Sequence, residues 1–325
     1  MSDAAFYRGR RVLVTGARGF LGGHVCAALA ESGADVIAVG RREADLTDQA
    51  AVRALMASTR PSWVMHLAAA CGGIAANVEN PGRFVHDNAL MGLLVLEEAR
   101  QAGAEGWTLV STTCAYPAEA PLPLCEDAIW QGPPAAATGP YGIAKRMLHA
   151  ALDGYRAQHG FEGVCLIPAN LYGPGDHMAP DRSHVVAALV RRFVEAAEAR
   201  APVVTCWGTG AATRELLHVR DAAAGIVALT ARHRGGGAVN LGTGVETSIR
   251  ALAGQVAAAA GFEGRIVWDA TKPEGQARRV LDVRRAAALG WRAAVGLDAG
   301  IAELVAWWRA ARPGPPSSSA RCRPG

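Results

Sequence analysis

The sequence is short of the features that mark membrane, secreted and metal-binding proteins. No apolar run reaches the roughly 18 residues that a membrane-spanning helix requires. Residues 1–11 are polar, whereas a secretion signal is built around an apolar stretch. The seven cysteines are odd in number and contain no C-x-x-C pair, so they predict neither a disulfide framework nor a zinc site. We therefore expect a cytoplasmic protein with reduced thiols, no metal and no membrane partner.

Charge is also scarce and nearly balanced. Charged residues make up 19% of the chain, and the formal net charge is +4 without a clustered basic face. Proteins that bind nucleic acid usually carry such a face, so we expect no nucleic-acid partner. Apolar residues, by contrast, fill 50% of the 325 positions, which is enough for one large hydrophobic core or two smaller ones.

Short β-rich runs alternate with helical stretches over the first half of the chain. Helices such as Leu21–Ser32 and Asn88–Ala102 are expected between the strands. The expected strands are Arg11–Val14, Ala34–Val39, Trp63–His66, Trp107–Val110 and Val164–Ile167. Continuous apolar strands that alternate with helices are typical of a parallel sheet covered on both faces. The pattern predicts an α/β fold with a Rossmann-like, doubly wound parallel sheet.

The composition of the sequence changes after Tyr172, where a Gly/Pro/Asp-rich loop is followed by a mixture of expected helices and short strands. We predict a dinucleotide-binding domain over residues 1–172, completed by parts of 215–245. A smaller C-terminal mixed α/β domain over 173–312 is expected to bind the substrate. Residues 313–325 are rich in Pro, Ser and Arg, and they predict a disordered tail.

A glycine run follows the first predicted strand. Gly16, Gly19 and Gly22 form the pattern G-x-x-G-x-x-G at the start of a helix. Glycine permits a tight turn and the close approach of a pyrophosphate, while the helix N-terminus faces the negative charge. Such a run alone is weak support, but its position at the first βα turn favours a dinucleotide site over a plain turn.

The end of the second predicted strand favours NADP over NAD. An NAD site usually places Asp or Glu there to accept the ribose 2′-hydroxyl, whereas here Arg41 and Arg42 follow the strand. Arg18 lies inside the glycine turn, and a guanidinium fork suits a 2′-phosphate. Glu43 and Asp45 follow soon after, so NAD stays possible.

Tyr141 and Lys145 are four residues apart and therefore share one face of a predicted helix. A phenol with a pKa of about 10 is a poor base at neutral pH, but a nearby ammonium group favours the phenolate. The pair could then move a proton to or from a substrate oxygen while hydride moves on carbon. Thr112, at the end of the fourth strand, either caps that strand or hydrogen-bonds the same oxygen, and residue type alone does not separate the two.

Seven segments together resemble the extended short-chain dehydrogenase/reductase family, also known as the NAD-dependent epimerase/dehydratase family. They are LAAACGGIAAN (Leu67–Asn77), STTCAYP (Ser111–Pro117), YGIAK (Tyr141–Lys145), PANLYGPGD (Pro168–Asp176), SHVVAALVRRF (Ser183–Phe193), WGTGAATRELLHVRD (Trp207–Asp221) and KPEGQARRVLDV (Lys272–Val283). These motifs span most of the chain and are more specific than the glycine run. Within the family, they most resemble the nucleotide-sugar epimerase/reductases.

The resemblance implies a role for each motif. Thr112, Tyr141 and Lys145 would form the reductase triad, and Cys114 with His184 the acid/base pair of an epimerisation. The nucleotide sugar would be held by Asn170, Arg192, Trp207, Arg214 and Lys272. NADPH would be held by Gly16, Arg18, Gly19, Phe20, Leu21, Gly22, Arg41, Arg42, Asp45, Leu46, Leu67, Ala68, Ala69, Asn88, Lys145, Pro168 and His184.

The implied substrate is a GDP-linked 4-keto-6-deoxy-mannose-like sugar, epimerised at carbons 3 and 5 and reduced at carbon 4 with NADPH. Three alternatives stay open: a redox-neutral GDP-mannose 5- or 3,5-epimerase with retained cofactor, a simple 4-ketosugar reductase, and a non-enzymatic NADP sensor. The resemblance also implies a homodimer formed through Asn88–Ala102 and the Tyr141 helix.

The chain departs from the family pattern at several positions. Thr112 stands where serine is usual, and Gly142 replaces the alanine of Y-A-x-A-K. The segment before Ile74 is one residue shorter, with Cys71 directly before the glycine pair. That loop is expected to lie near the cofactor and the sugar, so it bears on substrate identity more than on mechanism.

Overall fold

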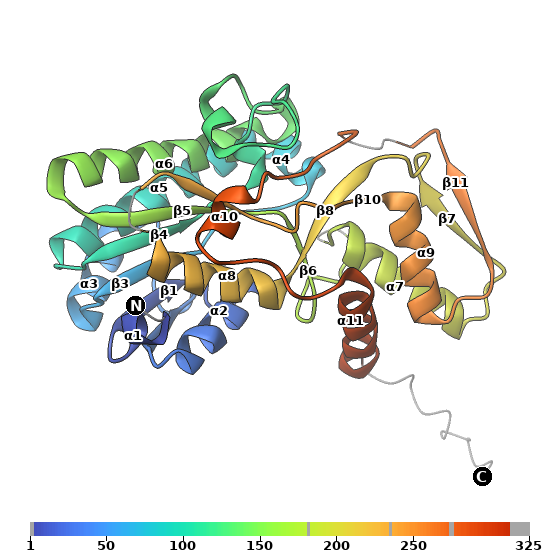
Figure 1. Cartoon of the computed structure of the whole chain (residues 1–325), viewed down its shortest axis with the longest axis horizontal. Helices are drawn as coiled ribbons and strands as arrows, with labels where there is room; N and C mark the ends of the chain where they lie inside the picture. Colours follow the sequence, from blue (N-terminus) through green and yellow to red (C-terminus); the bar gives the residue numbers. More distant parts are fainter. Residues whose placement is uncertain (1–2, 181–182, 234–235, 273–275, 313–325) are drawn as a thin grey trace, which may run out of the picture.

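Figure 1 shows the fold in a computed structural model, which describes residues 3–180, 183–233, 236–272 and 276–312. The predicted disordered tail, 313–325, lies outside the described residues. Within the described ranges, none of the helices combines the length and the apolar character needed to span a bilayer.

The larger part of the fold is built on a six-stranded parallel sheet with the strand order β2-β1-β3-β4-β5-β9. Its strands are β1 (Arg11–Thr15), β2 (Asp35–Val39), β3 (Trp63–His66), β4 (Gly106–Val110), β5 (Glu162–Pro168) and β9 (Ala238–Leu241). The strand order reverses between β1 and β3, and open α/β sheets bind ligands at such a switch point. The predicted Rossmann-like, doubly wound α/β fold is confirmed.

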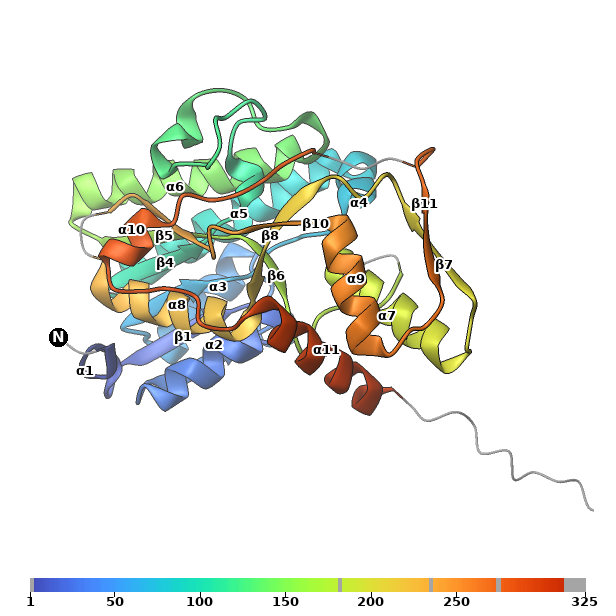
Figure 2. The same ribbon diagram turned by 45° about the vertical axis from the view of Figure 1, so that its right-hand side comes forward.

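Helices cover both faces of this sheet (Figures 1 and 2). One layer holds α1 (Asp3–Tyr7), α2 (Phe20–Glu31) and α8 (Val219–Arg232), and the other holds α3 (Gln49–Thr59), α5 (Pro81–Gln101) and α6 (Gly139–His159). Helices α5 and α6 pack closely, and Gly92 permits this because a Cβ there would lie 2.2 Å from Leu148 Cδ1. Gly160, in the left-handed region with a φ of 62°, ends α6.

A smaller mixed α/β part lies beyond the carboxyl ends of the sheet, on the right of Figure 1. Strands β6 (Asn170–Tyr172), β8 (Thr213–His218) and β10 (Glu246–Ser248) form one sheet. Strand β7 (Val203–Trp207) pairs in parallel with β11 (Arg265–Asp269). Three helices pack around these strands: α7 (Val185–Glu198), α9 (Ile249–Ala260) and α11 (Leu297–Ala311).

The buried apolar side chains form two clusters, one around the large sheet and one in the smaller part. Val227 of α8 and Val239 of β9 belong to the first, so the chain returns to the large sheet after residue 218. Phe193, Leu252 and Ile301 belong to the second. Five short elements complete the fold: α4 (Ile74–Glu79), η1 (Thr113–Ala115), η2 (Glu126–Trp130), η3 (Ala136–Thr138) and α10 (Arg284–Ala288). The domain boundaries expected at 172 and 312 stay predictions.

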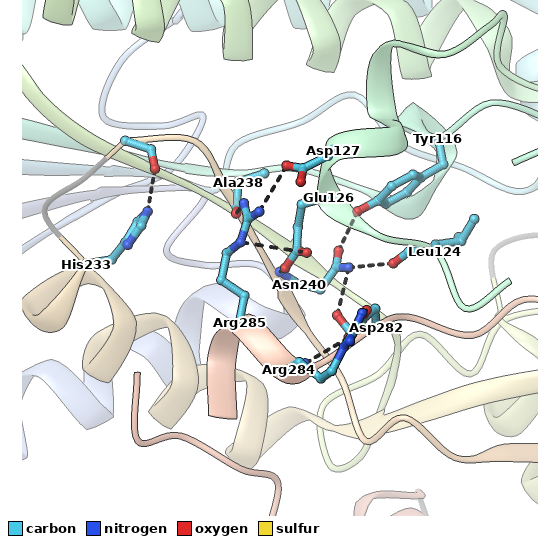
Figure 3. Close-up of polar contacts among 11 residues, drawn as sticks. Tyr116, Leu124, Glu126, Asp127, His233, Ala238, Asn240, Asp282, Arg284 and Arg285 are labelled. Carbon is cyan, nitrogen blue, oxygen red and sulfur yellow. Dashed lines mark hydrogen bonds and ion pairs between the residues drawn. The ribbon is translucent and has the colours of Figure 1, made fainter. Parts of the chain in front are cut away.

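A buried polar network ties the segment after β4 to β9 (Figure 3). Tyr116 donates its hydroxyl proton to Asn240 Oδ1 at 2.7 Å. Asn240 Nδ2 donates to the carbonyl oxygens of Leu124 at 2.8 Å and Asp282 at 3.1 Å. The Asn240 backbone donates to Glu126 Oε1 at 2.9 Å. Because buried polar groups are costly when unpaired, this network fixes the path of the chain just after Cys114.

Candidate active site

The glycine turn between β1 and α2 lies at the switch point of the sheet. Gly16 has a φ of +69°, and a Cβ on it would lie 2.9 Å from the backbone nitrogen of Ala68. A Cβ on Gly22 would lie 2.1 Å from the carbonyl oxygen of Gly16. Only glycine fits these positions. Helix α2 begins at Phe20, at the switch point, and within the described residues no side chain caps its N-terminus. This arrangement fits a dinucleotide pyrophosphate.

The loop after β3 lies on the other side of the switch point and contains the predicted cofactor contacts at residues 67–69. Asn88 of α5 holds this loop: its Oδ1 accepts from the backbone of Ala70 at 3.0 Å, and its Nδ2 donates back to the Ala70 carbonyl at 2.9 Å. The same Nδ2 donates to the Phe84 carbonyl at 2.7 Å. Asn88 is buried and engaged by the chain itself, so we infer that it positions the loop.

The end of β2 brings Arg18 together with Glu43, one of the two acids that kept NAD possible. Glu43 folds back onto the strand end, where its carboxylate accepts from Arg18 Nε at 3.1 Å and from the backbone nitrogen of Gly40 at 2.7 Å. These hydrogen bonds, the one from Arg18 above all, lower the pKa of Glu43 to about 2. Arg41 and Arg42 are exposed, and within the described part of the chain their side chains form no hydrogen bond or ion pair.

Three further predicted cofactor residues take different positions near the sheet edge. Asp45 Oδ1 accepts from the backbone and the hydroxyl of Thr47 at 2.9 and 2.7 Å, so its carboxylate stabilises the turn in which it lies. Leu46 is buried in the core. Pro168 ends β5 and is half-buried. Their contact with a cofactor stays a prediction.

Lys145 is almost fully buried beneath the carboxyl end of β4. Its ammonium group donates to the carbonyl oxygen of Val110 at 3.0 Å. Burial lowers the pKa of Lys145 to about 8. Burial, with the nearby Lys145 charge, also lowers the pKa of His66, whose Nδ1 lies 3.0 Å from Thr15 Oγ1. Lys145 is therefore a cation that a modest rise in pH would neutralise.

Tyr141 lies one helical turn before Lys145 at the start of α6. Its ring meets the edge of Phe84, with a centroid separation of 6.4 Å. Burial raises the pKa of the Tyr141 phenol, and the cysteines Cys71 and Cys114 add to the shift. Burial opposes the phenolate, and the expectation that the nearby lysine favours it stays a prediction. The phenol keeps its proton, which suits a group that donates a proton to an alkoxide.

Thr112 and Cys114 lie in the segment that links β4 to the η1 turn. Thr112 Oγ1 accepts from the Cys114 backbone at 3.2 Å, so it caps η1. A hydroxyl that accepts can still donate its own proton, and both interpretations of Thr112 can therefore hold. The carbonyl of Cys114 lies against α6, where a Cβ on Gly142 would approach it to 2.2 Å. That contact explains why glycine replaces alanine at this position.

His184 is the N-cap residue of α7 and has an exposed side chain. It lies near Asp176, whose pKa is raised by burial and pulled back by the charge of His184. Within the described residues, no hydrogen bond joins His184 to Cys114. Their pairing as acid and base stays a prediction.

The predicted sugar-binding residues come from the smaller part of the fold and from its junction with the sheet. Arg214 of β8 is anchored by its Nη1, which donates to the carbonyls of Thr213 at 2.6 Å and Gln276 at 2.7 Å. The Asn170 side chain donates to the Glu215 carbonyl at 3.1 Å. Arg192 donates to the Thr205 carbonyl, Trp207 is 63% exposed, and Lys272 is exposed.

Arg279 is a candidate that the sequence motifs did not indicate. Its Nη1 donates to Thr113 Oγ1 at 3.1 Å, next to Cys114. Burial, and then the nearby charge of Arg279, lower the pKa of Arg214. Two arginines therefore lie near each other beside η1. The basic dipeptide Arg278-Arg279 in the last motif could have suggested an anion-binding group. Its contact with Thr113 could not be predicted, because the two segments are far apart in the sequence.

A metal centre was not expected. In the ranges that the structure covers, no three or more His, Cys, Asp or Glu side chains gather as metal ligands would.

Comparisons with known proteins identify relatives over nearly the whole chain. The model of the NAD dependent epimerase/dehydratase family matches residues 12–242. GDP-L-fucose synthase of Escherichia coli (strain K12) is 37% identical, covering 92% of this chain and 96% of the relative. GDP-L-fucose synthase 1 of Arabidopsis thaliana is also 37% identical, with coverage of 95% and 94%.

The fold is also similar to solved structures. A GDP-L-fucose synthetase from Naegleria fowleri bound to NADP superposes with a TM-score of 0.85 at 25% identity, and the match covers 93% of each chain. The similarity includes both the large sheet and the smaller part, since it extends over almost all of this chain.

Proposed function

The chain belongs to the NAD dependent epimerase/dehydratase family, and we propose that it is a GDP-sugar epimerase/reductase like the GDP-L-fucose synthases. It is an oxidoreductase with isomerase activity that acts on a GDP-4-keto-6-deoxy-mannose-like sugar. One observation carries this proposal. The Cys114 carbonyl packs against Gly142 of α6, so a thiol and the Tyr141–Lys145 pair lie on adjoining elements.

Epimerisation requires a base and an acid at carbons 3 and 5. The keto group at carbon 4 makes these hydrogens acidic, because the resulting enolate carries its charge on oxygen. In our proposal Cys114 and His184 exchange these protons on opposite faces of the sugar. Tyr141, which keeps its proton, donates a hydrogen bond to the enolate oxygen.

Reduction of carbon 4 requires one hydride and one proton. A nicotinamide cofactor, held by its pyrophosphate at the glycine turn, would supply the hydride. Tyr141 then gives its proton to the carbon-4 oxygen, and the buried Lys145 cation stabilises the phenolate that remains. Thr112 can donate a hydrogen bond to the same oxygen.

The groups that would hold the GDP part suit a diphosphate and a base. Within the described residues Arg214 is anchored through Nη1 alone, so its other nitrogens can bind phosphate oxygens. Arg279 lies near it and adds a second positive charge. The indole of Trp207, 63% exposed, can stack on a base ring, an interaction worth roughly 1–3 kcal/mol.

We propose NADPH as the reductant. The relative from Naegleria fowleri is described with NADP bound, and Arg18 offers a guanidinium fork at the ribose end of the site. The glycine turn supports a nicotinamide dinucleotide in general, while the choice of NADPH depends on the groups at the end of β2.

We further propose a homodimer formed through α5 and α6. Leu93 of α5 is 36% exposed and Ile143 of α6 is 45% exposed, although both are large apolar residues. Exposed apolar side chains on two packed helices are suited to a second copy of the same surface.

The decisive experiment follows the absorbance of NADPH with GDP-4-keto-6-deoxy-mannose, and with GDP-mannose in parallel, while NMR identifies the product sugars. We expect one NADPH consumed per keto sugar and a product inverted at carbons 3 and 5. A Tyr141→Phe variant should bind the cofactor but lose turnover.

Each alternative predicts a different outcome. Conversion of GDP-mannose to an epimer without loss of NADPH would identify a redox-neutral epimerase. NADPH loss without inversion would identify a simple 4-ketoreductase. Cofactor binding without turnover of either sugar by the wild type, and unchanged binding in the Tyr141→Phe variant, would identify a cofactor sensor.

A further inference from the structure

The end of β2 forms a small anion seat, which we define as the Arg18 guanidinium together with the backbone N–H of Gly40. In the structure the Glu43 carboxylate occupies this seat. Its Oε2 accepts from the Gly40 backbone at 2.7 Å, and its two oxygens accept from Arg18 Nε at 3.1 and 3.3 Å. A Cβ on Gly40 would lie 3.1 Å from both Arg18 Cδ and Glu43 Oε2, so glycine leaves the room that the pairing needs.

The seat lies where a dinucleotide fold places the adenosine ribose. The glycine turn is joined to the end of β2, because the Ala17 backbone donates to the Val39 carbonyl at 3.1 Å. The carboxyl end of the second strand is the usual position of the group that reads the ribose 2′ substituent. The two donors of the seat would therefore face the 2′-hydroxyl of a bound NADH or the 2′-phosphate of a bound NADPH.

Glu43 is the acid that reaches the seat, and Asp45 is not. The Asp45 carboxylate accepts from the backbone and hydroxyl of Thr47 and is held within its own turn. Glu43 stays ionised over the working pH range, since the hydrogen bonds from Arg18 and Gly40 lower its pKa to about 2. A negative charge is therefore present at the ribose site before any cofactor arrives.

We propose that Glu43 determines the cofactor preference by competing with the 2′-phosphate for the anion seat, so that the enzyme binds both NADH and NADPH. With NADH, the carboxylate stays in the seat and accepts the 2′-hydroxyl proton. With NADPH, the phosphate displaces the carboxylate from Arg18 and Gly40, and the exposed Arg41 and Arg42 lie close in sequence to receive the released charge. This inference rests on the proposed nicotinamide-dependent function.

The displacement is feasible because the pairing lies at the surface. The Arg18 side chain is 62% exposed, and exposed ion pairs contribute little to stability. A phosphate with two charges can therefore replace a carboxylate with one. The expected effect of Glu43 on affinity is about tenfold, which is the size expected for a single charge-assisted hydrogen bond.

The test measures binding of NADP⁺ and NAD⁺ by calorimetry, without any sugar. In Glu43→Gln, we expect NADP⁺ to bind about tenfold more tightly and NAD⁺ about fivefold more weakly than in the wild type. Adenosine 2′,5′-bisphosphate and 5′-AMP should show the same divergence. Glu43→Ala, which removes both side-chain oxygens, should show it at least as strongly.

Glu105→Gln is the matched control. It removes the same charge from another exposed ion pair, with Arg10 at 2.7 Å, at the opposite end of the sheet. It should change neither affinity. The inference is overturned if NADP⁺ affinity in both Glu43 variants stays within twofold of the wild type, or if the control shifts equally. Because no sugar is present, a failed sugar assay leaves this result standing, and the reverse also holds.

Discussion

At the scale of single residues, the reductase pair shows opposite responses to burial. Burial lowers the pKa of Lys145 to about 8 and raises the pKa of Tyr141. A protonated phenol next to a readily neutralised ammonium is ready to donate a proton, but only while the ammonium remains charged to support the phenolate. The sequence predicted the pair from its spacing, whereas the direction of these shifts depends on burial by distant segments.

The pH dependence of reduction follows from the Lys145 shift. Below pH 8 the lysine is charged, and above it the charge is lost, so kcat/KM for the keto sugar should fall as pH rises through about 8. The check is a pH profile of kcat/KM, with NADPH binding measured over the same range as a control. A profile that stays flat to pH 10 would contradict a role for the Lys145 charge.

Cys114 gives a second prediction at this scale. Cys114→Ser should stop solvent deuterium from entering carbons 3 and 5 of the 4-keto sugar, with a loss of roughly a hundredfold or more, because serine is a far weaker acid than a thiol. NMR of the recovered sugar measures this exchange. NADPH should bind this variant normally. Exchange at the wild-type rate would remove Cys114 from the acid/base pair.

Residues with local constraints could be predicted from the sequence, whereas contacts between distant segments could not. The glycine positions could be read from the sequence because their constraint is local: Gly16 needs a positive φ and Gly22 meets Gly16 itself. Glu43 was noted only as an acid that kept NAD possible, since nothing local shows that it folds back onto Arg18. The contact of Arg279 with Thr113 joins segments that are far apart in the chain.

At the scale of elements, the packing of η1 on α6 positions the thiol relative to the phenol. Periodicity located the strands well, because those other than the partly exposed β2 are short apolar runs buried on both faces. It located α5 less well: the helix begins at Pro81, well before the expected Asn88, because its first turns carry exposed polar residues. The short η1 turn could not be predicted, since Thr112 caps it through a single hydrogen bond.

Gly142→Ala tests this contact between elements. The new Cβ would lie 2.2 Å from the Cys114 carbonyl, so η1 must move or α6 must shift. We expect a destabilisation of about 1–3 kcal/mol and a lower kcat, measured by thermal unfolding and the NADPH assay. Gly154→Ala is the control on the same helix, because nothing lies within 4 Å of its Cβ. It should stabilise the protein by about 0.5–1 kcal/mol. Equal stability of the two variants would mean that η1 packs loosely.

At the scale of the whole molecule, the site exists because two parts of the chain meet at the carboxyl edge of the sheet. Glu215 joins them: this buried carboxylate accepts from the backbones of Thr243, Gly244 and Leu281 at 2.6, 2.8 and 2.6 Å. Its neighbour Arg214 lies at the proposed diphosphate position. The family resemblance indicated Arg214 but not Glu215. A motif does not predict the Glu215 contacts, because its partners are backbone N–H groups, which every residue type other than proline carries.

The association of two molecules is the last property that the surface predicts. Leu93 lies on α5 beside α6, where Gly92 brings the two helices close together, and it stays 36% exposed in the single chain. In a symmetric dimer each copy would bury it, so Leu93→Asp would place two unpaired charges in one interface. An uncompensated buried charge costs about 3–5 kcal/mol. We therefore expect the dissociation constant of the dimer, measured by sedimentation, to rise at least about a hundredfold.

Val203→Asp is the matched control, because Val203 is equally exposed at 36% but lies on β7, away from these helices. If Leu93→Asp remains a dimer while keeping its fold, the interface lies elsewhere; if the wild type sediments as a monomer, α5 and α6 do not join two copies.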